Sequence, residues 1–245
     1  MVASAIPPAC FAGSTTDIVD PRMRLLASPG AIRTVALTLD ACGGGVDMRV
    51  IQTPLDLQVP ATLFVTAIWL RANPHMVPML RERGDLFSLQ NHGERHLPPV
   101  LGTHRVYGLP VAGTLEAVRH EVEAGADAIV ATSAPRPTWY RGAAALYSEA
   151  ALEAIDALRF RIAAYSLNAD EGASLPAAAV AARIGAASNG DIIIGHINQP
   201  HRSSGAGLAA GIVNLHQTGA VFALLDSLPV TPLDCHPGGH RDLLA

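Results

Sequence analysis

The chain has little charge and few aromatic side chains. Charged residues make up 16% of its 245 residues, aromatic residues 4%, and the formal net charge is −4. Proteins that bind nucleic acids need a basic surface to neutralise phosphates, so this composition argues against a nucleic-acid partner. No apolar stretch approaches the ~18 residues that a membrane-spanning helix requires. Because 49% of the residues are hydrophobic, we instead expect a large buried core, and the length is typical of one α/β barrel domain.

Cysteines are also few, and their number leaves at least one thiol without an intrachain partner. Cys10 and Cys235 lie near the termini, where the sequence is equally compatible with a disulfide and with two free thiols. Residues 1–13 are small and apolar, as in a weak signal peptide, but no positive charge precedes them and prolines interrupt them. We treat residues 1–25 as an N-terminal extension and residues 26–245 as a single domain. We expect a secreted or periplasmic protein and leave a cytoplasmic location open.

Strand-like apolar runs alternate with helical patterns from residue 34 onward. The helices have N-cap signals at Asn73, which precedes a proline at the first helical position, and at Thr114, Ser148 and Pro176. Strands that alternate with helices of ten or more residues are typical of βαβ units and a parallel sheet, so we predict an α/β fold. The predicted strands span residues 35–40, 61–66, 86–91, 138–141, 159–165, 191–196 and 220–225.

Polar residues come at or just past the C-terminal ends of these strands. Loops that leave those ends converge on one face of an α/β fold, where ligands bind. His92 and His96 are spaced i, i+4, which on a helical turn places both imidazoles on the same side, and imidazole nitrogen is a favoured zinc ligand. The other candidates of this kind are Asp40, Arg141, Asp170 and His196.

These segments resemble the motifs of the polysaccharide deacetylase family, also called the NodB-homology or carbohydrate esterase 4 family. The resemblance covers about residues 33–226 and implies an irregular (β/α)7 barrel. It further implies hydrolysis of N-acetyl groups on an amino-sugar polymer or oligomer, with release of acetate. The motifs are Thr38-Leu39-Asp40-Ala41-Cys42-Gly43, Asn91-His92-Gly93-Glu94-Arg95-His96, Trp139-Tyr140-Arg141-Gly142, Asn168-Ala169-Asp170 and Ile194-Gly195-His196.

The resemblance also implies a role for each candidate residue. Asp40 corresponds to the catalytic base that activates water, and Arg141 to the arginine that keeps this base ionised and oriented. His196 corresponds to the general acid, and Asp170 to the carboxylate that orients it. His92 and His96 correspond to ligands of one divalent metal, for which the ligand type suggests zinc. The expected partner is an N-acetylated glycan or a related small amide.

One motif departs from the family pattern. Ala41 occupies the position of the second acid of the first motif, which is normally the third metal ligand, and alanine cannot bind a metal. The candidates to replace it are Asp47, Cys42, Asp40 itself and a water molecule. We slightly favour Asp47, because the three glycines that precede it allow the loop to fold back.

Two other functions remain open at this point. Some relatives hydrolyse small non-sugar amides or cyclic ureides, in some cases without metal, and the loss of the second acid agrees with such a function. The chain could also be a non-catalytic saccharide-binding relative. The joint presence of Asp40, Arg141 and His196 argues against a pure binding protein, which needs no acid/base pair.

Overall fold

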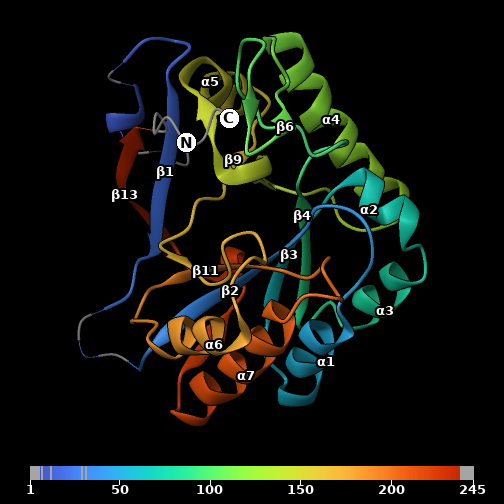
Figure 1. The fold of residues 1–245 in the computed structure, drawn as a ribbon, viewed down its shortest axis with the longest axis vertical. Helices are drawn as coiled ribbons and strands as arrows, with labels where there is room; N and C mark the ends of the chain where they lie inside the picture. The colour runs from blue at the N-terminus through green and yellow to red at the C-terminus, as the bar shows by residue number, and fades with distance from the viewer. Residues whose placement is uncertain (1–5, 7, 12, 29, 31, 238–245) are drawn as a thin grey trace.

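The computed structural model describes residues 6, 8–11, 13–28, 30 and 32–237, and its centre is a curved parallel sheet (Figure 1). The strand order is β10-β11-β2-β3-β4-β7-β9, and β12 pairs with the start of β2. Each predicted strand range overlaps one observed strand, and the predicted α/β fold of the (β/α)7-barrel type is confirmed. The strands are β2 (Thr34–Ala41), β3 (Ala61–Val65), β4 (Phe87–Asn91), β7 (Trp139–Tyr140), β9 (Arg161–Ile162), β10 (Leu167–Asn168), β11 (Ile192–His196) and β12 (Val221–Ala223).

Helices follow most of the strands and cover the outside of the sheet. Helices α1, α6 and α7 pack together on one side of it (Figure 1). Thr114 caps α4 as predicted, since its hydroxyl accepts a hydrogen bond from the N–H of Ala117 at 3.1 Å. In the ranges that the structure describes, no helix is long and apolar enough to cross a membrane. The helices are α1 (Met48–Leu57), α2 (Ala67–Ala72), α3 (Met76–Glu82), α4 (Leu115–Ala131), α5 (Glu149–Ala157), α6 (Ala177–Gly185) and α7 (Ser204–Gln217).

The helix predicted to start at Asn73 starts elsewhere. Thr66 caps the short helix α2 by accepting from the N–H of Trp69 at 3.0 Å, and α2 ends at Asn73. Helix α3 then begins at Met76. The prediction of an N-cap at Asn73 was wrong because this residue closes one helix, and its side-chain amide donates to the carbonyls of Trp69 and Gly44 at 2.9 Å each.

One face of strand β2 packs in an apolar layer, and the other faces the inside of the curved sheet. Leu37, Leu39 and Ala41 are fully buried in the main core cluster, which also contains side chains of α1 and α7. Alternate residues of a strand point to opposite faces. Thr38 and Asp40 therefore face the inside of the curved sheet, and this orientation brings their side chains together at its C-terminal edge.

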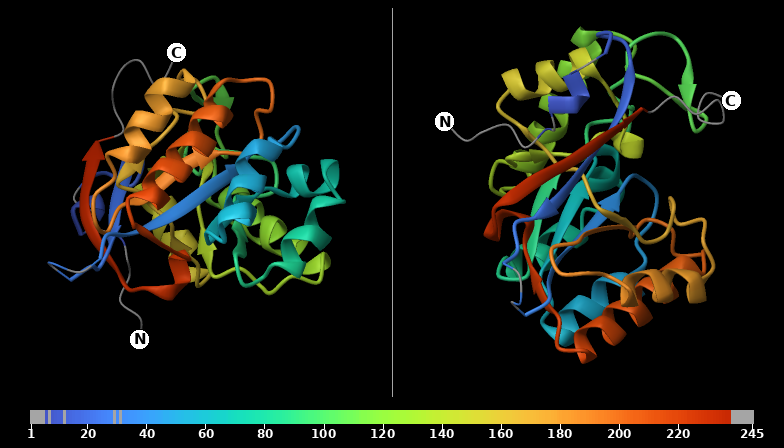
Figure 2. Two further views of the ribbon diagram at one scale, coloured as in Figure 1. Left: turned by 90° about the horizontal axis from the view of Figure 1, so that it is seen from below. Right: turned by 90° about the vertical axis from the view of Figure 1, so that its left-hand side faces the viewer.

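A second, antiparallel sheet joins the two ends of the chain. Strand β1 (Ile18–Leu25) pairs with β13 (Val230–Pro237) on one edge and with β8 (Tyr147–Ser148) on the other (Figure 2). A disulfide links Cys10 to Cys235, so of the two states left open for these cysteines the structure has the bonded one. Residues 1–5, 7 and 12, which include much of the stretch considered as a signal peptide, lie outside the described residues.

Candidate active site

Asp40 and Arg141 form a buried ion pair at the C-terminal end of β2. Arg141 Nη1 donates to Asp40 Oδ1 at 2.8 Å and to Thr38 Oγ1 at 2.9 Å, and Nε donates to a main-chain carbonyl at 3.0 Å. Burial alone would raise the pKa of Asp40, but the Arg141 guanidinium, together with His92 and His196, holds the pKa of this carboxyl below its usual value. The site therefore contains an ionised carboxylate in a fixed orientation.

His196 lies beside Asp40 because their strands are neighbours. Strands β11 and β2 are parallel, and His196 and Asp40 are partners in their register. Asp170, in the loop after β10, is fully buried and accepts from both the N–H and Nδ1 of His196 at 2.8 Å each. Burial would lower the pKa of His196, but the charge of Asp170 and its hydrogen bond raise the pKa well above the usual value for histidine. Asp170 thus favours the protonated form of the imidazole that stands next to Asp40.

His92 and His96 meet on the loop that follows β4. His92 is 1% exposed, and its Nδ1 donates to the carbonyl oxygen of Arg141 at 2.7 Å. Because that oxygen can only accept, the bond orients the ring and leaves Nε2 of the neutral imidazole free to bind a metal. The two imidazole centroids are 4.9 Å apart. The expected proximity is therefore present, but residues 92–96 form a loop, and the helical turn suggested by the spacing is not the structural reason for it.

Glu121 of α4 holds this loop in place and was not found from the sequence. Its Oε1 accepts from the N–H groups of Arg95 and Leu97 at 2.8 Å and 3.1 Å, on either side of His96, whose φ is 65°. A residue with a side chain rarely adopts this left-handed conformation, so the flanking bonds help to maintain it. The sequence did carry a signal, because Glu121 is a charged residue on the apolar stripe that also includes Val118 and Val122.

Cys42 completes a cluster of metal-binding side chains with the two histidines. One ligand atom each from Cys42, His92 and His96 lies within 4.8 Å of the others, and Cys42 Sγ is 3.5 Å from His92 Nε2. Burial raises the pKa of the Cys42 thiol, but hydrogen bonds with His196, His92 and His96 outweigh it and set the pKa well below the usual value. Sulfur and imidazole nitrogen are the donor types that zinc prefers. The residues present thus fit a divalent cation of this kind.

Asp47 is not part of this cluster, which corrects our preference for it as the third ligand. It is the N-cap of α1, and its Oδ1 accepts from the N–H and Nε of Arg49 at 3.1 Å and 2.8 Å. Its Oδ2 accepts from Arg49 Nη2 at 2.6 Å. Both carboxylate oxygens are therefore engaged in starting the helix and binding its first turn.

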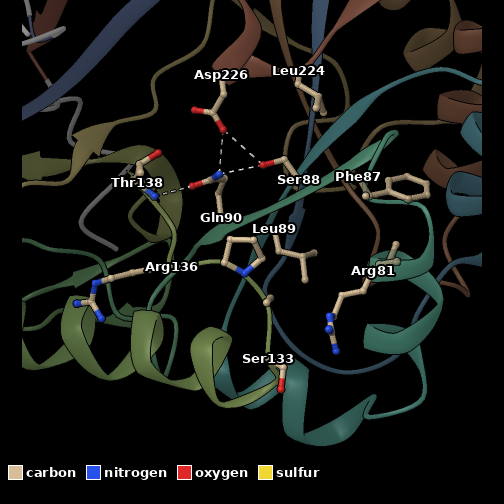
Figure 3. Close-up of a pocket in the computed structure, with 14 residues that line it drawn as sticks. Arg81, Phe87, Ser88, Leu89, Gln90, Ser133, Arg136, Thr138, Leu224 and Asp226 are labelled. Carbon is tan, nitrogen blue, oxygen red and sulfur yellow. Dashed lines mark hydrogen bonds between the residues drawn. The ribbon is translucent and has the colours of Figure 1, made fainter.

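A cavity of about 760 Å³ lies apart from these groups, at the beginning of β4 (Figure 3). Its polar side chains bind one another: Gln90 Nε2 donates to Ser88 Oγ at 2.9 Å and to Asp226 Oδ2 at 3.1 Å, while Gln90 Oε1 accepts from the N–H of Thr138 at 3.0 Å. No residue of the acid, base or histidine set lines this cavity. We therefore place the candidate active site at the opposite, C-terminal edge of the sheet.

The fold and the site define an α/β protein with an acid/base pair beside a cluster of metal-binding side chains, and sequence comparison gives its family. The model of the family described as polysaccharide deacetylase matches residues 27–163, more than half of the chain. The chain belongs to the polysaccharide deacetylase family and is a hydrolase of amide bonds. The matched segment includes Asp40, His92, His96 and Arg141, whereas Asp170 and His196 lie beyond it. No curated protein matches the chain.

Solved structures of similar fold agree with this family. The family 4 carbohydrate esterase from Streptomyces lividans, in complex with acetate, has a TM-score of 0.65 at 17% identity, with 80% of this chain and 94% of that chain covered. The peptidoglycan deacetylase PdaC from Bacillus subtilis has a TM-score of 0.65 at 18% identity, with 82% and 91% covered. A mutant of a family 4 pseudoenzyme from Bacillus anthracis, with restored enzymatic activity, has a TM-score of 0.67 at 17% identity, with 82% and 68% covered. At these identities the likeness concerns the fold.

Proposed function

We propose that the protein is a metal-dependent deacetylase that removes N-acetyl groups from an amino-sugar oligomer or polymer and releases acetate. The observation that supports this best is the pairing of Asp40 with Arg141 and of His196 with Asp170 on adjacent strands. The first pair favours the ionised form of the Asp40 carboxylate, and the second favours the protonated form of the His196 imidazole. These are the states that a general base and a general acid need before the reaction.

In the proposed reaction Asp40 accepts a proton from water as the water oxygen attacks the acetamide carbonyl carbon. The C–N bond then breaks, His196 donates its proton to the leaving nitrogen, and the products are acetate and a free amine. Arg141 keeps Asp40 aimed and ionised, while Asp170 keeps the His196 ring in one orientation. A divalent cation, which His92 and His96 would hold, would polarise the carbonyl and lower the pKa of water.

We propose an N-acetylated glycan such as peptidoglycan as the substrate. A related fold is that of a peptidoglycan deacetylase, and the family is one of polysaccharide deacetylases. The disulfide between Cys10 and Cys235 agrees with an oxidising compartment, where such a glycan is accessible. We therefore also propose a secreted or periplasmic location.

Acetate release from the purified, zinc-loaded protein tests this function. Chitooligosaccharides, peptidoglycan fragments and simple non-sugar acetamides serve as parallel substrates, and we expect release from at least one of the glycans. Release only from the small amides, or from none of the three, would overturn the proposal.

Asp40→Asn is the matched variant for the chemical step. It should lower kcat by about 10²–10⁴-fold, the contribution of a general base, while the zinc content stays the same. Combined replacement of His92 and His96 by Ala should instead remove the zinc. If Asp40→Asn also loses zinc, Asp40 is a metal ligand and its assignment as base is wrong.

A further inference from the structure

We propose that Cys42 is the third protein ligand of the metal, as a thiolate, in the place left by the missing second acid; this rests on the proposed metal-dependent function. Cys42 is the residue next to Ala41 in the chain, and its Sγ is 3.5 Å from His92 Nε2. Cys42, His92 and His96 together offer three ligand atoms within 4.8 Å of one another. Three protein ligands with one position open for water or substrate is the usual arrangement of a catalytic zinc site.

The path of the chain explains why residue 42, and not residue 41, offers a ligand atom beside the histidines. Ala41 is fully buried in the apolar layer with Leu37 and Leu39, between the sheet and the helices. Its methyl group is part of this layer and offers no ligand atom. Cys42, one residue further, leaves the strand on the side where His92 lies, and it is the free cysteine of the chain because the other two form the disulfide.

The loop that carries Cys42 is held in position by the rest of the fold. Four consecutive carbonyl groups each accept a hydrogen bond from a different buried side chain, and these side chains come from two separate segments, helix α2 with its two caps and the loop after β11. A loop fixed in this way presents its thiol in one place, as a metal ligand requires. The pairs are Thr66 Oγ1 to Cys42 O at 2.7 Å, Asn198 Nδ2 to Gly43 O at 2.9 Å, Asn73 Nδ2 to Gly44 O at 2.9 Å and Trp69 Nε1 to Gly45 O at 3.2 Å.

The two carboxylates considered for the third ligand lie outside this group of ligand atoms. Both carboxylate oxygens of Asp47 bind Arg49. Asp40 Oδ1 binds Arg141, and Asp40 Oδ2 is 3.8 Å from His92 Nε2. With Cys42 as ligand, Asp40 stays available as the base. A donor set of one sulfur and two nitrogens favours zinc over magnesium or manganese, which prefer oxygen ligands.

Cobalt(II) binding to the full-length, metal-free protein tests this proposal directly. A thiolate bound to cobalt gives an intense charge-transfer band in the near ultraviolet, whereas histidine and water ligands do not. The wild-type protein should show this band on addition of one equivalent of cobalt. Zinc should displace the cobalt and abolish the band. Cobalt that binds without the band would overturn the proposal.

Three variants identify the thiol. Cys42→Ser should lose the band and weaken zinc binding by at least about tenfold, since even changes outside the ligand shell cost about 10–100-fold. The double variant Cys10→Ser with Cys235→Ser is the matched control and should keep the band. Cys42→Asp restores an oxygen ligand and should bind metal without the band, with a preference moved toward manganese. Zinc affinity that is unchanged in a folded Cys42→Ser protein would contradict the proposal.

The same measurements separate this proposal from the proposed function. If the charge-transfer band is present but no glycan releases acetate, the thiolate ligand stands and the deacetylase function fails. If acetate is released while bound cobalt lacks the band, the function stands and the thiolate ligand fails.

Discussion

At the scale of single residues, the site contains two ionisable groups, Asp40 and His196, whose partners shift their pKa values in opposite directions. Asp40 is buried and His196 is mostly buried, and burial disfavours a charge on either of them. Arg141 overcomes this for Asp40, whose pKa is lowered, and Asp170 overcomes it for His196, whose pKa is raised. A deacetylase needs this division, because the base must be free of its proton at the pH at which the acid still carries one.

Asp170→Asn tests whether Asp170 raises the pKa of His196. Without the charge of Asp170, burial dominates and the pKa of His196 falls, so His196 loses its proton at a lower pH. We expect the alkaline limb of the kcat/KM profile to move to lower pH and kcat to decrease by about 10²-fold or more, as for an impaired general acid. The measurement is acetate release across the pH range at fixed zinc.

Glu171→Gln is the matched control for that experiment. Glu171 is the next residue in the chain, but its carboxylate pairs with Arg183 at 2.7 Å near the surface. The control should keep the wild-type profile. An alkaline limb that stays in place in Asp170→Asn would show that Asp170 does not set the protonation of His196.

The sequence was sufficient to select most of the side chains that meet at this site but not Cys42, the proposed third ligand. Asp40, His92, Arg141 and His196 follow strands, and the topology of a parallel sheet brings strand ends together whatever the details. The choice among Asp47, Cys42, Asp40 and water depended on which way one loop turns. A cue against Asp47 was present, since an aspartate that precedes the apolar pair Val50 and Ile51 is also a typical N-cap.

At the scale of elements, short and non-local pieces were harder to predict than the repeated βα units. The seven predicted strand ranges rest on apolar runs, and each overlaps an observed strand. Helix α2 has six residues, too few for a helical rhythm to be visible. Strand β1 does alternate, with Val19, Met23 and Leu25 buried, but Pro21 within it argues against a strand. The structure accommodates this proline at an irregularity in the pairing with β13.

The contact between α6 and α7 depends on glycine, and this gives an element-scale prediction. A Cβ at Gly207 of α7 would lie 2.4 Å from the carbonyl oxygen of Ala177 and 2.7 Å from Val180 Cβ. Gly207→Ala would therefore push the two helices apart, and we expect the free energy of unfolding to fall by about 1–3 kcal/mol. Urea denaturation would measure this decrease, and we expect the m-value to stay unchanged.

Gly185, in the last turn of α6, is the matched control. A Cβ there would have no atom within 4 Å, and its φ is not in the left-handed region. Gly185→Ala should leave stability unchanged or raise it by about 0.5–1 kcal/mol through helix propensity. Equal destabilisation by both substitutions would mean that close packing of α6 on α7 is not the cause.

At the scale of the whole molecule, the N- and C-terminal strands tie together parts of the fold that the parallel sheet leaves separate. The sheet path ends at β9 on one side and β10 on the other. Strand β1 bonds to both regions: the N–H of Met23 donates to the carbonyl of Tyr165 at 3.3 Å, and that of Leu25 to the carbonyl of Gly190 at 2.8 Å. Because β13 pairs along β1, the C-terminal segment is held against the same part of the fold.

The disulfide between Cys10 and Cys235 should therefore stabilise the whole fold. It joins residues 225 positions apart, and a cross-link over so long a loop restricts the unfolded chain strongly. We expect the double variant Cys10→Ser with Cys235→Ser to lose about 2–4 kcal/mol in free energy of unfolding, measured by urea denaturation without reductant. Its zinc affinity should stay at the wild-type value, because the disulfide packs against the cluster around Val122 and Tyr147, whereas the proposed ligands Cys42, His92 and His96 lie on the loops after β2 and β4. Thiol titration of the denatured wild-type protein provides the independent check: one thiol should react before reduction and three after it, as the cysteine count requires. Three reactive thiols before reduction, or an unfolding midpoint that the double substitution leaves in place, would contradict a stabilising disulfide.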